Sequence, residues 1–246
     1  MIASRRIAVV AGALFILATA SSLAAAALLP ALTGADYLTG VADSSDQLAV
    51  SALLYLVAAG ASVGIAIALY PVLKEIDAAL ALGSVVFRTI EAVFYTAGVV
   101  SLLSIATLGQ QLAAAPSADR ASMYAMADSL LSVHDHSALV AVFAFSLGAS
   151  MYYAVMYRSR LVPRWLSGWG LAAAIPMLAA CLLALFNDDP VTGYVLLVLP
   201  IAVQEMVFAV WLLVKGFNPS PLTPKASSAA APRITLSAAT GPMGSH

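Results

Sequence analysis

The chain has 246 residues, of which 62% are hydrophobic and only 9% charged, and its formal net charge is −1. A soluble domain usually has about 25% charged residues, so this composition excludes an ordinary soluble domain and indicates an integral membrane protein. The near-zero net charge gives no electrostatic support for a nucleic-acid partner. The single cysteine, Cys181, lies in an apolar run, so neither an internal disulfide nor a cysteine-based metal site is expected.

An apolar segment over residues 7–29, preceded by Arg5 and Arg6, predicts the first membrane-spanning helix. Two basic residues before an apolar run are also found in cleavable signal peptides. This run has about 23 residues, however, and a signal core has 7–15. We therefore favour a retained signal anchor. The loop that follows, residues 30–47, contains three aspartates and no basic residue.

The second predicted span covers residues 48–70 and is expected to end at Pro71. It contains Gly60 and Gly64, a GxxxG spacing that lets helix backbones approach closely in lipid. Packing within one bundle is the favoured interpretation. The alternative is a homodimer that associates through the Gly60/Gly64 face.

The third predicted span, residues 84–108, is unusual because it carries Arg88 and Glu91 three positions apart. Residues at i and i+3 share one face of a helix. Such a pair is costly in lipid unless a group on another helix answers it. The best candidate for that group is Glu205, near the middle of the last apolar segment.

Residues 110–132 contain a helix-start signal at Pro116 and Ser117 and apolar residues near helical spacing. They predict a short helix that lies on the outer membrane surface. The alternative is an outward extension of the next span. The spacing of Ser132 and Asp135 matches a capping box, which predicts that the fourth span, residues 137–157, begins separately.

The fifth and sixth predicted spans cover residues 165–186 and 191–214, with Pro176 and Pro200 inside them. A tight acidic turn joins the two spans, and Gly216 is suited to end the last helix. Residues 218–246 are rich in Pro, Ser and Ala without periodicity, which predicts a disordered cytoplasmic tail. The expected fold is therefore an all-α, polytopic membrane bundle of six transmembrane helices within residues 1–217.

The basic residues test this arrangement and predict its orientation. If the N-terminus is cytoplasmic, ten basic residues fall on that side and only Arg120 falls outside. The ten are Arg5, Arg6, Lys74, Arg88, Arg158, Arg160, Arg164, Lys215, Lys225 and Arg233. Cytoplasmic loops of membrane proteins carry an excess of Lys and Arg, so both termini are expected in the cytoplasm.

Four polar side chains inside the spans form the first candidate site: Arg88, Glu91, Gln204 and Glu205. Glu205 lies too deep to reach water along its own stem, so it is expected to be paired, protonated or in a watery cavity. One interpretation is an internal ion pair that holds the bundle together. The other is a ligand or proton site near the midplane, where the two prolines would open a cavity.

A second polar group lies at the outer side: Asp128, His134, Asp135 and His136. Two histidines at i and i+2 point about 200° apart on a helix, so one turn cannot aim both at a single ion. We therefore expect a helix cap rather than a metal site. No Gly-rich phosphate loop and no nucleophilic motif is present, so no cofactor is expected.

Several segments together resemble an uncharacterised bacterial family of multi-pass membrane proteins, a domain-of-unknown-function family. They are Leu69-Tyr-Pro-Val-Leu-Lys74, Phe87-Arg-Thr-Ile-Glu-Ala92, Tyr157-Arg-Ser-Arg-Leu-Val-Pro-Arg-Trp165 and Leu199-Pro-Ile-Ala-Val-Gln-Glu205. The resemblance covers about residues 5–217. It implies six helices and a location in the bacterial inner membrane, and it implies no activity, substrate or cofactor.

Three functions remain open on the sequence. The leading hypothesis is a non-enzymatic protein of the lipid bilayer that binds a small lipophilic ligand beside Glu205, as a transporter or a sensor. The first alternative is an intramembrane metal-dependent hydrolase that acts on lipid at the outer face, through His134, Asp135 and His136. The second alternative is a structural or accessory subunit that associates through Gly60 and Gly64.

Overall fold

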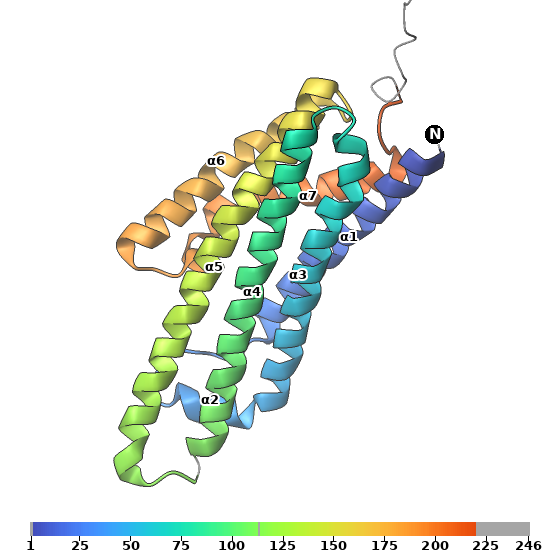
Figure 1. Ribbon diagram of the computed structural model, residues 1–246. Coiled ribbons are helices and arrows are strands. Elements are labelled where there is room, and N and C mark those ends of the chain that lie inside the picture. Colours follow the sequence, from blue (N-terminus) through green and yellow to red (C-terminus); the bar gives the residue numbers. More distant parts are fainter. Residues whose placement is uncertain (1, 113, 220–246) are drawn as a thin grey trace, which may run out of the picture.

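The computed structural model describes residues 2–112 and 114–219, which form an α-helical bundle without strands in this part of the chain (Figure 1). The helices are α1 (Ile2–Leu28), α2 (Tyr37–Asp43), α3 (Ser45–Leu73), α4 (Ala78–Leu112), α5 (Ser117–Ser159), α6 (Arg164–Asn187), the short 3-10 helix η1 (Val191–Tyr194) and α7 (Val195–Val214). Six of these segments are long and apolar enough to cross a membrane. The predicted six-helix, multi-pass membrane bundle is confirmed.

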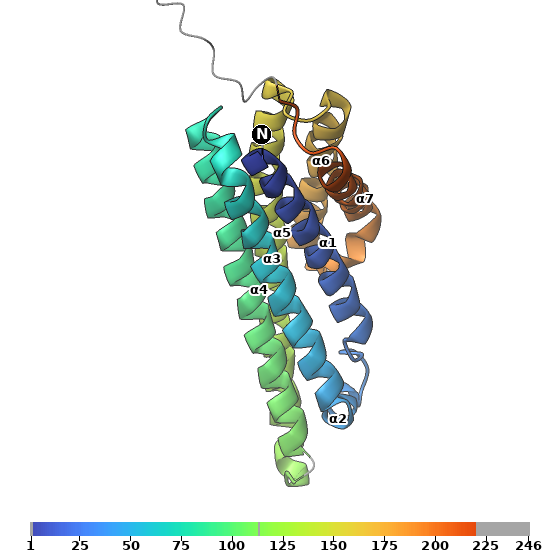
Figure 2. The same ribbon diagram turned by 90° about the vertical axis from the view of Figure 1, so that its right-hand side faces the viewer.

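The six long helices form a closed ring in which each packs against its two neighbours. The order is α1, α3, α4, α5, α6 and α7, and α7 returns to pack against α1. One end of the ring carries the start of α1, the end of α7 and the α3–α4 and α5–α6 connections (Figures 1 and 2). We call this end the basic face, since it holds Arg5, Arg6, Lys74, Arg158, Arg160, Arg164 and Lys215. The opposite end, the acidic face, holds Asp36, Asp43, Asp46, Asp119, Asp188, Asp189 and Arg120.

Helices α4 and α5 extend beyond the other spans at the acidic face (Figure 1). With 35 and 43 residues they are longer than a bilayer requires, since about 20 residues cross the hydrocarbon core. The separate surface helix expected before residue 137 is wrong, because residues 117–136 are the first half of α5. The capping-box spacing at Ser132 starts no helix, because a continuous helix already satisfies these backbone groups.

A small second core explains why this polar half of α5 stays helical. It is formed where α2 packs against the extensions of α4 and α5, around Leu38, Val41, Ile105 and Ala127. A Cβ atom at Gly109 of α4 would lie 2.8 Å from the Leu38 carbonyl oxygen, so the glycine allows α2 to pack closely. Helix α2 was not predicted, because residues 30–47 have no long apolar period.

Tyr37 and Asp128 link α2 to α5. The Tyr37 hydroxyl donates a 2.7 Å hydrogen bond to Asp128 Oδ1. Burial, together with the neighbouring carboxylate, raises the pKa of the Tyr37 phenol above its usual value. Asp128 therefore has a structural partner at the acidic face.

One helix end differs from the prediction, and another agrees. Helix α3 continues past Pro71 to Leu73, because a proline near the last turn disturbs few backbone bonds. Gly216 follows α7 with φ of +72°, as expected for a residue that ends a helix. Asn218 donates its backbone N–H to the Leu161 carbonyl at 2.8 Å, so the chain is anchored here. The predicted disorder of residues 220–246 lies outside the described residues.

The two glycines of the GxxxG spacing have different surroundings. A Cβ atom at Gly64 would lie 3.2 Å from Leu14 Cδ1 of α1, so Gly64 allows close packing inside the bundle. A Cβ atom at Gly60 would meet nothing within 4 Å. Gly60 lies on the exposed side of the shallow groove between α3 and α4.

Candidate functional site

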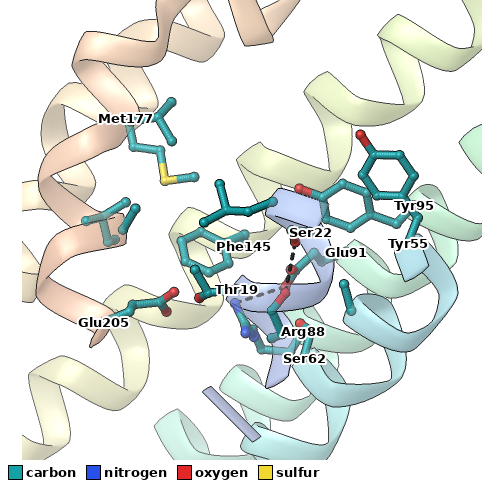
Figure 3. A pocket seen from close by; sticks show the side chains of 16 residues that line it. Thr19, Ser22, Tyr55, Ser62, Arg88, Glu91, Tyr95, Phe145, Met177 and Glu205 are labelled. Atoms are coloured by element: carbon teal, nitrogen blue, oxygen red, sulfur yellow. Dashed lines mark hydrogen bonds and ion pairs between the residues drawn. The ribbon is translucent and has the colours of Figure 1, made fainter. Parts of the chain in front are cut away.

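The ring of helices encloses a cavity of about 230 Å³ to which all six spanning helices contribute side chains. Most of its lining is apolar, including Phe145 and Met177. The polar lining residues are Thr19, Ser22, Tyr55, Ser62, Arg88, Glu91, Tyr95 and Glu205. Figure 3 shows that the Arg88–Glu91 pair and Glu205 reach the cavity from opposite sides, with Phe145 and Thr19 between them. The cavity therefore brings together three of the four buried polar residues predicted as a site.

Arg88 is held by contacts on three sides. Its Nη1 lies 3.1 Å from Glu91 Oε2, and these side chains are only 2% and 5% exposed. Its guanidinium lies over the ring of Phe145, 4.5 Å from the centroid. A Cβ atom at Gly148 would lie 3.2 Å from Arg88 Cγ, so the glycine of α5 makes room for the arginine stem. The local reason for the pair is the i, i+3 spacing on α4.

The Arg88–Glu91 contact is close but not well aligned. Arg88 Nε and Nη1, Glu91 Oε2 and Ser62 Oγ are fully buried atoms without a hydrogen-bond partner of good geometry. The attraction between Arg88 and Glu91 is therefore mainly electrostatic. Unsatisfied buried groups of this kind are costly.

Glu205 is less completely buried and points into the cavity from α7. Its Oε1 accepts a hydrogen bond of 3.2 Å from the Tyr152 hydroxyl. Within the described residues Oε2 has no hydrogen-bond donor, and it is not a fully buried atom, since the side chain borders the cavity. No ion pair joins Glu205 to Arg88 in residues 2–112 and 114–219. Glu205 thus offers one open carboxyl oxygen to the cavity.

Gln204 belongs to a different environment, although it precedes Glu205 directly. Its Oε1 accepts a 2.7 Å hydrogen bond from Tyr153, and its Nε2 donates to the Leu166 carbonyl at 3.1 Å. It is fully buried and does not line the cavity. The geometry makes Gln204 a link between α5, α6 and α7 rather than a residue within reach of a ligand.

An aromatic layer lies between the cavity and the basic face. Phe15, Tyr152, Tyr153 and Phe208 stack edge to face and are all fully buried. The lining residues beyond this layer include Leu23 of α1, which is 67% exposed, and the half-buried Ala202 of α7. The cavity therefore opens sideways between α1 and α7, toward the bilayer.

Sequence reasoning missed four tyrosines that matter here: Tyr55 and Tyr95 in the cavity wall, and Tyr152 and Tyr153 beneath it. A usable signal was present. A tyrosine hydroxyl within an apolar span cannot reach the backbone of its own helix, so it needs a partner on another helix. Serine and threonine give no such signal, because they bond their own carbonyls, as Ser22 does with Ala18.

The residues of the outer polar group do not converge on one point. His134 Nδ1 lies 3.1 Å from the Gly98 carbonyl oxygen, facing α4, whereas His136 Nδ1 lies 2.7 Å from the Ser132 carbonyl oxygen. Asp135 and His136 line a cavity of about 120 Å³ with Asp188 and Asp189, and His134 and Asp128 do not. Among the described residues, no three His, Cys, Asp or Glu side chains are grouped so that they could hold a metal ion.

Comparison with known proteins gives one match. A family model described as a domain of unknown function (DUF4386) matches residues 10–216. This range includes the whole cavity lining and most of each spanning helix. Neither the comparison with curated proteins nor that with solved structures found a match.

Proposed function

The chain belongs to the DUF4386 family, whose domain has no known function, and we propose that it is a non-enzymatic membrane protein that binds a small lipophilic ligand, as a transporter or a sensor. The observation that carries this proposal is the cavity of about 230 Å³, lined by all six spanning helices and containing Arg88, Glu91 and Glu205. Ligand sites are typically concave, mostly apolar and provided with a few convergent polar groups. The volume lies below the 300–1,000 Å³ of drug-sized sites, so the ligand is small.

The sideways opening supports a ligand that reaches the site from the bilayer. The exposed margin, at Leu23 and Ala202, belongs to two of the helices that are long and apolar enough to span a membrane. A water-soluble ligand would need a path from one of the faces. On the basic side the fully buried aromatic layer lies in that path.

We place the protein in the bacterial cytoplasmic membrane, with the basic face toward the cytoplasm. The support is the segregation of basic residues to one end of the ring, which is typical of cytoplasmic loops. Association of two chains through the α3–α4 groove at Gly60 remains a further proposal. Gly64, in contrast, already packs against Leu14 in its own chain.

The ligand-binding proposal is tested by filling the cavity. Ala202 lines the cavity and Ala13 is exposed on the outside of α1, so Ala202→Phe and Ala13→Phe form a matched pair. Thermal unfolding of the purified protein in detergent is measured with and without benzyl alcohol, a small amphiphilic probe. We expect the probe to raise the Tm of the wild type and of Ala13→Phe, because it binds the folded state, and not that of Ala202→Phe. An equal shift in both variants would contradict binding in this cavity.

A further inference from the structure

The ionisable groups around the cavity do not balance in charge. Two carboxyl groups, Glu91 and Glu205, face one guanidinium, that of Arg88. The other titratable side chains packed nearby are phenols and one thiol, which are ordinarily uncharged at neutral pH: Tyr55 of α3, Tyr95 of α4, Tyr152 and Tyr153 of α5, and Cys181 of α6. The polar groups that helix α1 contributes are the hydroxyls of Thr19 and Ser22, and neither carries a charge. With both carboxyls ionised the site would hold one uncompensated negative charge, which is costly away from water.

The charged group without an ion-pair partner is Glu205. Arg88 already has Glu91 Oε2 at 3.1 Å from its Nη1, and its Nε and Nη1 have no accessible surface. The Glu205 carboxyl borders the cavity with one oxygen unoccupied. The charged group of the cavity that is left to pair with a ligand is therefore an acceptor of hydrogen bonds and of positive charge.

The other lining residues favour a ligand whose uncharged part is apolar or aromatic. Phe145, Tyr55 and Tyr95 offer aromatic surface, and Met177 adds a polarizable thioether. Aromatic faces attract ammonium groups as well as apolar surface. An inorganic cation would instead need several oxygen ligands around one point, and among the described residues no three His, Cys, Asp or Glu side chains are grouped in this way.

We propose that the ligand is a small lipophilic amine in its ammonium form, which binds the Glu205 carboxylate in exchange for a proton. This inference rests on the proposed ligand-binding function and specifies its ligand class. In the empty site the Glu205 carboxyl holds the proton, and the charge of the site is zero. The incoming ammonium replaces that proton, which leaves to solvent, so one positive charge enters and one departs.

The test uses two probes of nearly the same shape, benzylammonium and benzyl alcohol, with the full chain in detergent. We expect benzylammonium to bind at least about tenfold more tightly than benzyl alcohol at pH 8. Its affinity should fall as the pH decreases, because protons compete for the same carboxyl. In weakly buffered solution near pH 6, an indicator dye should report about one proton released per bound benzylammonium, and none for benzyl alcohol.

Variants assign the effect to Glu205. Glu205→Gln should lose the preference for benzylammonium and the proton release, while still binding benzyl alcohol. Glu75→Gln, which removes an exposed carboxyl at the basic face, should behave as the wild type. If Glu205→Gln fails to fold, Tyr152→Phe serves as a second variant, because it removes the hydrogen bond to Glu205 but leaves the carboxyl. It should retain proton release with an affinity changed severalfold.

The outcomes separate the two proposals. Binding of benzyl alcohol without preferential binding of benzylammonium would overturn the amine and leave the ligand-binding function standing. Proton release that persists in Glu205→Gln, or that sodium ions alone produce to the same extent, would also overturn it. If neither probe binds the wild type, the ligand-binding function fails together with the inference.

Discussion

The ion-pair partner of Arg88 is Glu91 on the same helix, and this pairing determines how replacing Arg88 should change the stability. Arg88→Met would leave Glu91 buried without a counter-charge, which typically costs about 3–5 kcal/mol of stability. Replacing both groups, in Arg88→Met/Glu91→Gln, should recover part of that loss, since no unpaired charge remains. A double-mutant cycle of thermal unfolding in detergent measures the coupling between the two residues. Simple additivity would mean that the ion pair contributes nothing.

The two adjacent tyrosines of α5 should differ in importance. Among the described residues Tyr153 is the one donor to Gln204 Oε1, which is fully buried, so we expect Tyr153→Phe to cost about 1–3 kcal/mol of stability. Tyr152→Phe should cost less, because Glu205 borders the cavity, where water can replace the hydroxyl. Thermal unfolding of the two variants under identical conditions gives the comparison. A larger loss for Tyr152→Phe would show that the Glu205 contact supports the fold.

At the scale of single residues, the sequence predicts only part of the candidate site. Charged residues inside an apolar span are visible from composition, and the i, i+3 spacing pairs Arg88 with Glu91. Which way Gln204 and Glu205 point cannot be read from adjacent positions, since neighbours on a helix face about 100° apart. The position of Glu205 beside the cavity, and of Gln204 away from it, follows only once α5 and α6 are in place.

At the scale of the helices, α3 packs closely against α1 at Gly64 but has open space around Gly60. Gly64→Leu should lower the Tm by several degrees, because the new side chain would displace Leu14 of α1. Gly60→Leu should leave the Tm nearly unchanged in the monomer, since open space surrounds this position. Light scattering in detergent adds the oligomeric state. A dimer that dissociates in Gly60→Leu alone would support association through the α3–α4 groove.

Hydropathy locates the spans well and their ends poorly. It recognises the part of a helix that fits hydrocarbon, so residues 84–108 were predicted where α4 covers Ala78–Leu112. Beyond the hydrocarbon a helix continues as long as another element covers one of its sides. For α4 and α5 that element is α2, whose seven residues are too short and too polar to be predicted.

For the whole molecule, the segregation of charge predicts the orientation in the membrane. In a Cys181→Ala background, single cysteines at Ser117 and Asp188 of the acidic face should react with an impermeant thiol reagent in intact cells. A cysteine at Glu75 of the basic face should react only after the cells are opened. All three positions are exposed, so accessibility alone does not separate them. The reverse labelling pattern would place the basic face outside.

The closure of the ring between α1 and α7 also sets an order of events during synthesis. Arg5 Nη1 and Nη2 donate hydrogen bonds to the carbonyls of Leu212 and Leu213, more than 200 positions later in the chain. At about 5–20 residues per second, the first helix must wait roughly 10–40 s in the membrane before its last partner is made. During that interval the cavity has no wall on the α7 side, and Glu205 does not yet exist to face Arg88 and Glu91. The nascent chain therefore contains the Arg88–Glu91 ion pair first, and the carboxyl without a counter-charge, Glu205, is inserted last.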